Sequence, residues 1–318
     1  EKSGIIVAVL KNVTASELIA DNFNPNFPPD GSKAESKTIE GTYLSDTLVG
    51  GFGDDTIKGL EGNDTIDGQA GSDVIYGGEG NDIIEGNFGN DEIYGDSGND
   101  TITDDSGSNI LDGGSGDDNL TSRSLSGDHT LKGGYGRDTL TATGKKVTLE
   151  GGDENDNIYA YGYIDKEGSR SYLEEGEATI TGGGGNDYIR VEYYETVNAE
   201  GGEGNDSFNL ENIKGDVKVN TGNGNDNFYI YSTKGDIEVD LGDGDDYLNS
   251  NNTETSLVIK GKEGKDNVNS RQGLKVEFDG GAGNDTFTAY DFLNGNLSGG
   301  IGDDQLTATY YSDPWAIS

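Results

Sequence analysis

The chain has 318 residues, of which 61 are acidic and 21 basic, so its formal net charge is −40, and only 30% of its residues are hydrophobic. A chain this acidic and this poor in apolar residues cannot offset its conformational entropy by burial alone, so its acids must be neutralised before it compacts. Nucleic acid is not an expected partner, because a phosphate backbone is bound by clustered lysine and arginine, and no apolar run is long enough for a membrane span.

The sequence contains no cysteine, no methionine and a single histidine, His129. The lack of cysteine excludes disulfides and thiolate metal sites. Without an initiating methionine, the chain is expected to be a processed product or an excised segment of a longer protein.

The first 38 residues carry no repeat and are expected to form a cap and linker. An apolar stretch at residues 5–10 suits a capping strand, and residues 15–23 suit a short helix or turn. Residues 24–33 contain three of the four prolines and are expected to be a linker.

Nine nonapeptides follow one another without a gap over residues 41–121. Clear copies are GGFGDDTIK (residues 50–58), GLEGNDTID (59–67) and GGSGDDNLT (113–121). The sixth position is aspartate in every copy except one, where Asn109 stands, and the eighth is always isoleucine or leucine. Two units make one coil of 18 residues, and coils stack as parallel strands about 4.8 Å apart. The pattern predicts an all-β, right-handed parallel β-roll with coils of 18–20 residues.

Each unit has the composition of a metal-binding turn followed by a strand. Glycines at positions one, two and four are expected to adopt positive φ and so allow a tight turn. The turn directs main-chain carbonyls inward beside the carboxylate of position six, and such an all-oxygen site suits Ca²⁺. Positions seven to nine form a short strand whose eighth side chain points into the core.

After residue 121 the motif recurs once per coil, at spacings of 18–20 residues with one exception of 31. The other half-coil is expected to be a strand, a turn and a strand, as in NIKGDVKVN (residues 212–220). Its turns are expected to use lysine in place of calcium: Lys145, Lys146, Lys214 and Lys234. The exception places a surface loop or hairpin within residues 160–181. The expected organisation is therefore a cap and linker (1–38), a two-edged roll (39–121), a roll with one calcium-binding edge (122–307) and a C-terminal cap (308–318).

The spacing sorts the position-six residues into two columns. The long edge is expected to carry Asp46, Asp64, Asp82, Asp100, Asp118, Asp138, Asp156, Asp187, Asp206, Asp226, Asp246, Asp266, Asp285 and Asp304. The short edge is expected to carry Asp55, Asp73, Asp91 and Asn109 and then to stop. Ions that sit between stacked turns number one fewer than the turns, which predicts about 15 Ca²⁺ ions and offsets most of the −40 charge.

These nonapeptides resemble the RTX (haemolysin-type) calcium-binding repeat, most closely over residues 41–121 and with interruptions up to residue 307. The resemblance implies Ca²⁺ held between same-edge turns by the position-six aspartates and by turn carbonyls. It also implies bacterial type I secretion and folding outside the cell or at its surface. Among the departures from the family pattern, Leu44 and Glu154 replace the fourth glycine, Thr221 and Leu241 replace the first, and Asn109 replaces aspartate.

Two functions fit these observations. The first is a structural or adhesive extracellular protein, such as a segment of an adhesin, a filament or a surface layer, with itself as a partner. The second is a carbohydrate-binding module, or a carbohydrate-active β-helix associated with a lyase or epimerase. Several tyrosines fall at outward strand positions: Tyr159, Tyr161, Tyr188, Tyr229, Tyr231, Tyr247 and Tyr290. Their presence is explained either by the high β-propensity of tyrosine or by a stacking surface for a glycan or a protein. No enzyme is expected, because His129 lies in a degenerate turn and the basic residues are scattered.

Overall fold

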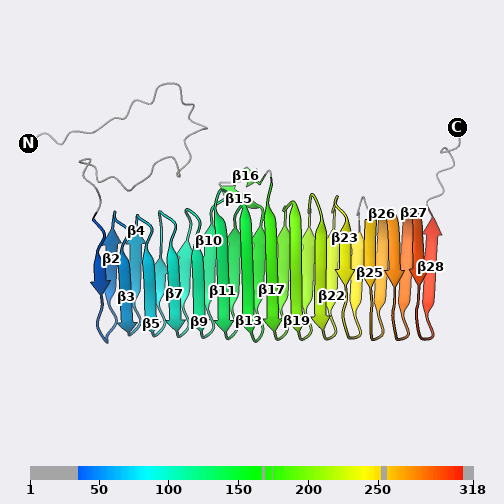
Figure 1. Ribbon diagram of the computed structural model, residues 1–318, viewed down its shortest axis with the longest axis horizontal. Helices are drawn as coiled ribbons and strands as arrows, with labels where there is room; N and C mark the ends of the chain where they lie inside the picture. Colours follow the sequence, from blue (N-terminus) through cyan, green and yellow to red (C-terminus); the bar gives the residue numbers. More distant parts are fainter. Residues whose placement is uncertain (1–34, 167–168, 174, 252–255, 311–318) are drawn as a thin grey trace, which may run out of the picture.

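The computed structural model describes residues 35–310, except residues 167–168, 174 and 252–255. It confirms the predicted fold: about 14 coils stack into an all-β parallel solenoid whose two ends lie far apart (Figure 1). No helix occurs among the described residues, and so none there could cross a membrane. The cap, helix and linker expected before residue 34, and the tail from residue 311, lie outside the described residues.

One long face of the roll, the first sheet, consists of parallel strands contributed once per coil. Its strands are β1 (Thr38–Glu40), β3 (Thr56–Glu61), β5 (Val74–Glu79), β7 (Glu92–Ser97), β9 (Ile110–Ser115), β11 (Asp128–Tyr135), β13 (Lys146–Asp153), β17 (Glu177–Gly184), β19 (Thr196–Glu203), β21 (Val217–Asn223), β23 (Ile237–Asp240) and β25 (Ser256–Lys260).

The opposite face, the second sheet, is built in the same way from the other half of each coil. Its strands are β2 (Thr47–Gly51), β4 (Thr65–Gln69), β6 (Ile83–Glu85), β8 (Thr101–Asp104), β10 (Asn119–Arg123), β12 (Thr139–Thr143), β14 (Asn157–Tyr161), β18 (Tyr188–Glu192), β20 (Ser207–Glu211), β22 (Asn227–Tyr231), β24 (Tyr247–Asn251) and β28 (Gln305–Tyr310). Two strands, β26 (Asn267–Asp279) and β27 (Thr286–Ser298), continue from the second sheet into the first.

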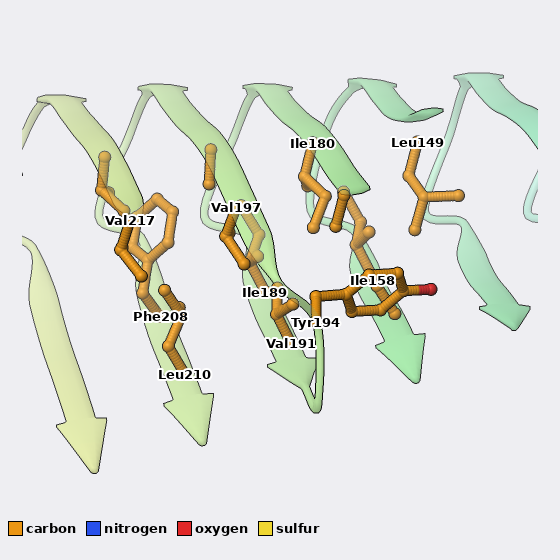
Figure 2. Packing of buried hydrophobic residues seen from close by; sticks show 14 of the residues in the cluster. Leu149, Ile158, Ile180, Ile189, Val191, Tyr194, Val197, Phe208, Leu210 and Val217 are labelled. Atoms are coloured by element: carbon orange, nitrogen blue, oxygen red, sulfur yellow. The ribbon is translucent and has the colours of Figure 1, made fainter. Parts of the chain in front are cut away.

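The core is a thin layer between the two sheets. The position-eight residues pair in register from coil to coil and are almost all fully buried, as predicted: Ile57, Ile66, Ile75, Ile84, Ile93, Ile102, Leu111 and Leu120. In later coils larger side chains take this place, among them Phe208, Phe228 and Phe287. Figure 2 shows the interior there, with Ile158, Ile189 and Phe208 projecting from neighbouring second-sheet strands. In the first coils most strands contribute a single large apolar side chain to this layer, so every coil also depends on what fills its two edges.

The insertion is a β-hairpin, formed by β15 (Tyr163–Lys166) and β16 (Ser169–Tyr172), which pair antiparallel. It projects from the upper edge of the roll in Figure 1, whereas the lower edge is an unbroken row of similar turns. Strand β17 already belongs to the first sheet from Glu177 onward, so the insertion is shorter than the expected residues 160–181.

Candidate metal sites

The long edge, where each first-sheet strand turns into a second-sheet strand, carries a continuous ladder of aspartates. In each step the backbone N–H of one position-six aspartate donates to Oδ1 of the next, at distances of 2.7–3.1 Å. The ladder joins all fourteen residues assigned to this edge, from Asp46 to Asp304, and crosses the insertion between Asp156 and Asp187 without interruption. The structure thus brings the whole set into one column.

The short edge, where second-sheet strands turn back, carries a shorter ladder of the same kind. Asp55 N–H donates to Asp73 Oδ1 and Asp73 N–H to Asp91 Oδ1, both at 2.7 Å. Asp91 N–H then donates to Asn109 Oδ1 at 3.1 Å. The next residue of this column is His129, so the acidic part of the short edge ends as expected.

The second carboxylate oxygen of nearly every column aspartate is buried and has no hydrogen-bond partner. This holds for Oδ2 of Asp55, Asp64, Asp73, Asp82, Asp91, Asp100, Asp118, Asp138, Asp156, Asp187, Asp206, Asp226, Asp246, Asp266 and Asp285. Of the remaining assigned residues, Asp46 lies in the first turn, where Thr42 donates to its Oδ2 from the backbone N–H at 2.6 Å and from the hydroxyl at 2.9 Å. Buried polar atoms are rarely left unsatisfied, so a repeated orphan oxygen indicates a missing positive partner.

Most of these orphan oxygens face a main-chain carbonyl across a space that a position-one glycine leaves open. A Cβ built on Gly59 would lie 2.3 Å from Asp64 Oδ2 and 2.3 Å from the carbonyl oxygen of Gly77, one coil later. Positive φ occurs at positions two and four, for example at Gly78 and Gly80, but not at position one. The expectation that all three glycines adopt positive φ was therefore wrong for position one, where glycine is needed for space.

Burial keeps these carboxyls reluctant to ionise. It raises the pKa of Asp73 and of Asp118 to about 7, and that of Asp246 to about 8. The backbone N–H that each accepts lowers the pKa, but less than burial raises it, and neighbouring column carboxylates raise it further. Ionising these columns near neutral pH is therefore unfavourable unless a positive partner compensates the charge.

The donor set fits a hard cation such as Ca²⁺. Across the described residues, no point is approached by three or more Asp, Glu, His or Cys side chains. An ion in a turn would thus take one or two carboxylate oxygens and complete its shell with main-chain carbonyls or water. Ca²⁺ accepts six to eight oxygen ligands in irregular geometry, whereas softer metals prefer nitrogen or sulfur.

Asn109 does not share this geometry. Its Oδ1 continues the ladder, but its Nδ2 donates to the carbonyl of Ser106 at 2.9 Å, so nitrogen stands where the aspartates have a free oxygen. An amide nitrogen is not a ligand for Ca²⁺, and this geometry argues against the assignment of Asn109 as a metal residue. His129, one coil on, is buried, and its Nδ1 and Nε2 lie 2.9 Å from Ser122 Oγ and 3.2 Å from Ser124 O. Burial lowers the pKa of His129, so a neutral imidazole fills the interior of this turn.

The lysines of the later short-edge turns do not replace calcium inside those turns, and that expectation was wrong. Lys145, Lys146, Lys214 and Lys234 are exposed. Lys146 pairs with Glu177 at 3.5 Å, and Lys214 Nζ donates to the Leu173 carbonyl at 2.6 Å, both at the surface of the roll. Apolar residues occupy the interior: the column that held Asp91 continues as Val147, Ala178, Val197, Val217, Ile237, Leu257 and Val276.

Two features of the turns escaped the sequence analysis. Position-five residues form a second ladder in the opposite direction, in which Asn81 N–H donates to Asn63 Oδ1 and Asn99 N–H to Asn81 Oδ1. The recurring Asn-Asp pair at positions five and six was the sequence signal that could have indicated this ladder. The other is Asp104, whose buried Oδ2 is also an orphan although it lies outside position six.

Comparison with protein families agrees with this geometry. A family model described as the RTX calcium-binding nonapeptide repeat matches residues 40–75, 59–93, 67–102, 94–123, 130–162, 175–191 and 277–297. The chain therefore contains RTX calcium-binding nonapeptide repeats. The matches leave residues 192–276 uncovered, although the RTX turns continue there with Asp206, Asp226, Asp246 and Asp266 in the long-edge column. No curated protein matches the sequence.

Proposed function

We propose that this RTX chain is an extracellular structural or adhesive protein whose β-roll is folded by calcium bound in its stacked turns. The observation that carries the proposal is the double column of buried Asp Oδ2 atoms without partners. RTX repeats in general bind Ca²⁺. Bound ions would supply positive charge in place of the apolar interior that the chain lacks.

The proposed ligands are the seventeen column aspartates. Where Oδ2 has no partner, it acts together with a ligand atom of the position-one residue of the next coil, which is the carbonyl in most turns. Asp64 with the Gly77 carbonyl is one such pair, and Asp82 with the Gly95 carbonyl is the next. Because an ion lies between two turns, each one ties adjacent coils together. About 15 ions would offset about 30 of the 40 excess negative charges.

The test is folding and ion binding by the full chain. Circular dichroism in excess EGTA should show coil, and strand signal should return when Ca²⁺ is added. Equilibrium dialysis should count about 15 ions per chain. The count should fall for Asp226→Ala and stay unchanged for Asp243→Ala, which removes an exposed carboxylate from the next turn of the same edge. A native spectrum in EGTA, or a count near zero, contradicts the proposal.

The extracellular role rests on two arguments. RTX repeats are typical of secreted bacterial proteins, and millimolar calcium is found outside the cell, where the columns could fill. An unfolded, strongly acidic chain at low cytosolic calcium also suits passage through a type I secretion channel. If the role is assembly, light scattering in millimolar Ca²⁺ should show particles larger than one chain, and EGTA should reverse this.

A second candidate function, glycan binding, is favoured by one specific observation. The hairpin gathers six tyrosine rings with centroid distances of 4.9–6.2 Å: Tyr159, Tyr161, Tyr163, Tyr172, Tyr188 and Tyr193. Beside them runs a groove lined by Asp105, Arg123, Thr141, Thr143, Tyr161, Tyr163 and Ile164. Flat rings beside hydroxyl, carboxylate and guanidinium groups suit a sugar, and the net charge favours a neutral one.

Affinity electrophoresis in gels containing neutral polysaccharides tests this candidate. Retardation of the calcium-loaded chain should be lost in Tyr161→Ala and kept in Tyr76→Ala, which removes a tyrosine from the opposite sheet. Equal migration of both variants and the parent chain in every gel would exclude the groove as a glycan site.

A further inference from the structure

The short-edge column ends at a turn whose composition differs from all earlier ones. In the coils before it, position one is glycine, as at Gly50, Gly68 and Gly86. Eighteen residues after Gly86 the same place is taken by Asp104, at the end of β8, and position six of that turn is Asn109. The turn has thus lost the carboxylate that the motif requires and gained one where the motif requires glycine.

The Asp104 side chain enters the space that glycine leaves open in the other turns. A Cβ built on Gly68 would meet Asp73 Oδ2 at 2.6 Å and the Gly86 carbonyl oxygen at 3.0 Å. A Cβ built on Gly86 would instead meet Asp104 Oδ2 at 2.4 Å and Asp91 Oδ2 at 2.9 Å. The carboxylate of Asp104 therefore stands where the earlier turn presents a carbonyl, and it faces Asp91.

Neither of the two Oδ2 atoms accepts a hydrogen bond. Asp91 and Asp104 are 2% and 1% exposed, and Oδ2 of each lacks a hydrogen bond, while Asp104 Oδ1 accepts the Ser106 N–H at 3.2 Å. The nearby donor Asn109 Nδ2 is already engaged by the Ser106 carbonyl.

We propose that Asp91 and Asp104 bind one Ca²⁺ between their Oδ2 atoms, in a two-carboxylate site that closes the short-edge column. The proposal rests on the proposed function, because it takes calcium to be the ion of the other turns. It differs from those sites in its ligands, since a side chain replaces a carbonyl and brings a second formal charge. Affinity for Ca²⁺ rises with the number of charged ligands, so this site should fill at lower calcium than its short-edge neighbours.

Asp104 also compensates for Asn109. With asparagine at position six this turn holds no position-six carboxylate, and without Asp104 the ion beside Asp91 would have Asp91 Oδ2 as its single anionic ligand. The carboxylate at position one restores an anionic ligand for an ion at that level. Beyond it, Ser122 and neutral His129 fill the edge without charge, so no further ion is required.

The experiment compares three variants of the full chain. Asp104→Asn removes the charge with little change in shape, and Asp104→Gly restores the motif residue. Glu85→Gln is the matched control, because it makes the same acid-to-amide change at an exposed residue adjacent to Gly86. Equilibrium dialysis with Ca²⁺ counts the ions, and hydrogen exchange follows the calcium needed to protect residues 86–109.

Both Asp104 variants should bind one ion fewer, or require about tenfold more Ca²⁺ for protection of residues 86–109. Glu85→Gln should match the parent chain. Protection of residues 182–302 at saturating Ca²⁺ shows that each variant folds. If Asp104→Asn and Asp104→Gly bind as the parent does while Asp226→Ala loses ions, this site is refuted and the proposed function stands. If the parent chain itself binds no calcium, the proposed function fails.

Discussion

The first region of the roll, residues 41–121, and the second, residues 122–307, differ in the side chains that fill the edges of their coils. In the first region both edges carry orphan aspartate oxygens, and the core consists of single isoleucines and leucines. In the second region only the long edge does, and the short-edge interior is mostly apolar. The column that began with glycine holds Val191, Leu210 and Ile230, and then the buried Ser250 and Ser270. Each coil needs its edges filled, and either metal with carboxylates or hydrocarbon can fill them.

The exchange takes place over two coils. The short-edge column passes from Asp91 through Asn109 and His129 to Val147. A charged carboxylate is thus followed by two neutral polar side chains and then by an apolar one. Surface charge changes in parallel. Among the described residues, every ion pair uses a basic residue after residue 121: Lys132, Arg137, Lys146, Arg190, Lys260, Lys262 and Lys275. The second region should therefore depend less on calcium.

The largest expected effect is a regional difference in calcium dependence. When Ca²⁺ is lowered stepwise, residues 41–121 should lose hydrogen-exchange protection at a calcium concentration about tenfold higher than residues 182–302, because both of their edges depend on bound ions. Peptide-resolved hydrogen exchange in calcium–EGTA buffers measures this. Simultaneous loss of protection in both regions would show that the apolar edge contributes no independent stability.

Acid should partly replace calcium. Column carboxyls such as Asp100, Asp118 and Asp246 have pKa values of about 6, 7 and 8 in the metal-free fold, against an ordinary value near 3.8. Between pH 4 and pH 8 the metal-free folded state thus binds more protons than the unfolded chain. The free-energy cost of ionising the buried carboxyls is therefore fully present above pH 8 and decreases as the pH falls toward 4. In EGTA, strand signal should grow between pH 8 and pH 5, more in the first region than in the second.

With calcium present the sign reverses. Bound Ca²⁺ requires ionised carboxylates, so its affinity should fall over the same pH range. Circular dichroism in EGTA, beside dialysis in Ca²⁺, separates the two effects. A metal-free chain that stays unfolded at pH 5 would show that charge repulsion in the columns is not what opposes folding.

Replacing Leu210 by alanine should weaken the second region without altering its ions. Leu210 is fully buried at the apolar short edge, and such truncations cost about 2–5 kcal/mol. Urea unfolding at saturating Ca²⁺ should show a loss in that range, with an unchanged ion count. Ser207→Ala, on the outward side of the same strand, should cost less than about 0.5 kcal/mol. A changed ion count for Leu210→Ala would mean that the edges do not act separately.

The register of the roll could be predicted from the sequence because the nine-residue period fixes which residues stack. The position-six ladder and the buried position-eight residues depend on nothing else, and the structure has them as expected. Asp104 was missed because it lies in a unit that departs from the motif, DDSGSN at residues 104–109, where the motif position does not indicate a ligand. The tyrosine cluster was only partly foreseen, since the hairpin brings Tyr163 and Tyr172 against Tyr193 by folding back.

The position-one glycines show a second limit. Sequence reasoning gave all three glycines one cause, conformational freedom, and that cause applies to positions two and four. What position one requires is open space beside two oxygens of different coils, a property of stacking that no single unit contains. At Asp104, where the short-edge column ends, a side chain occupies this space.

The smallest expected effect concerns the long edge, where Thr221 and Leu241 interrupt the position-one glycines. Thr221 Oγ1 donates to the Leu241 carbonyl at 2.5 Å, and the corresponding carbonyl in other turns faces the orphan aspartate oxygen. A carbonyl that already accepts a hydrogen bond is a weaker ligand for the ion at Asp226. One hydrogen bond contributes about 1 kcal/mol, so Thr221→Gly should tighten that site by up to about fivefold. Thr221→Ser keeps the hydroxyl and should bind as the parent does, and calorimetric titration can compare the three chains.

If serine and glycine tighten the site equally, the threonine methyl group and not the hydrogen bond weakens it. The Ca²⁺ affinity of this long-edge site would then be set by side-chain packing, which also determines the stability of the short edge in this region.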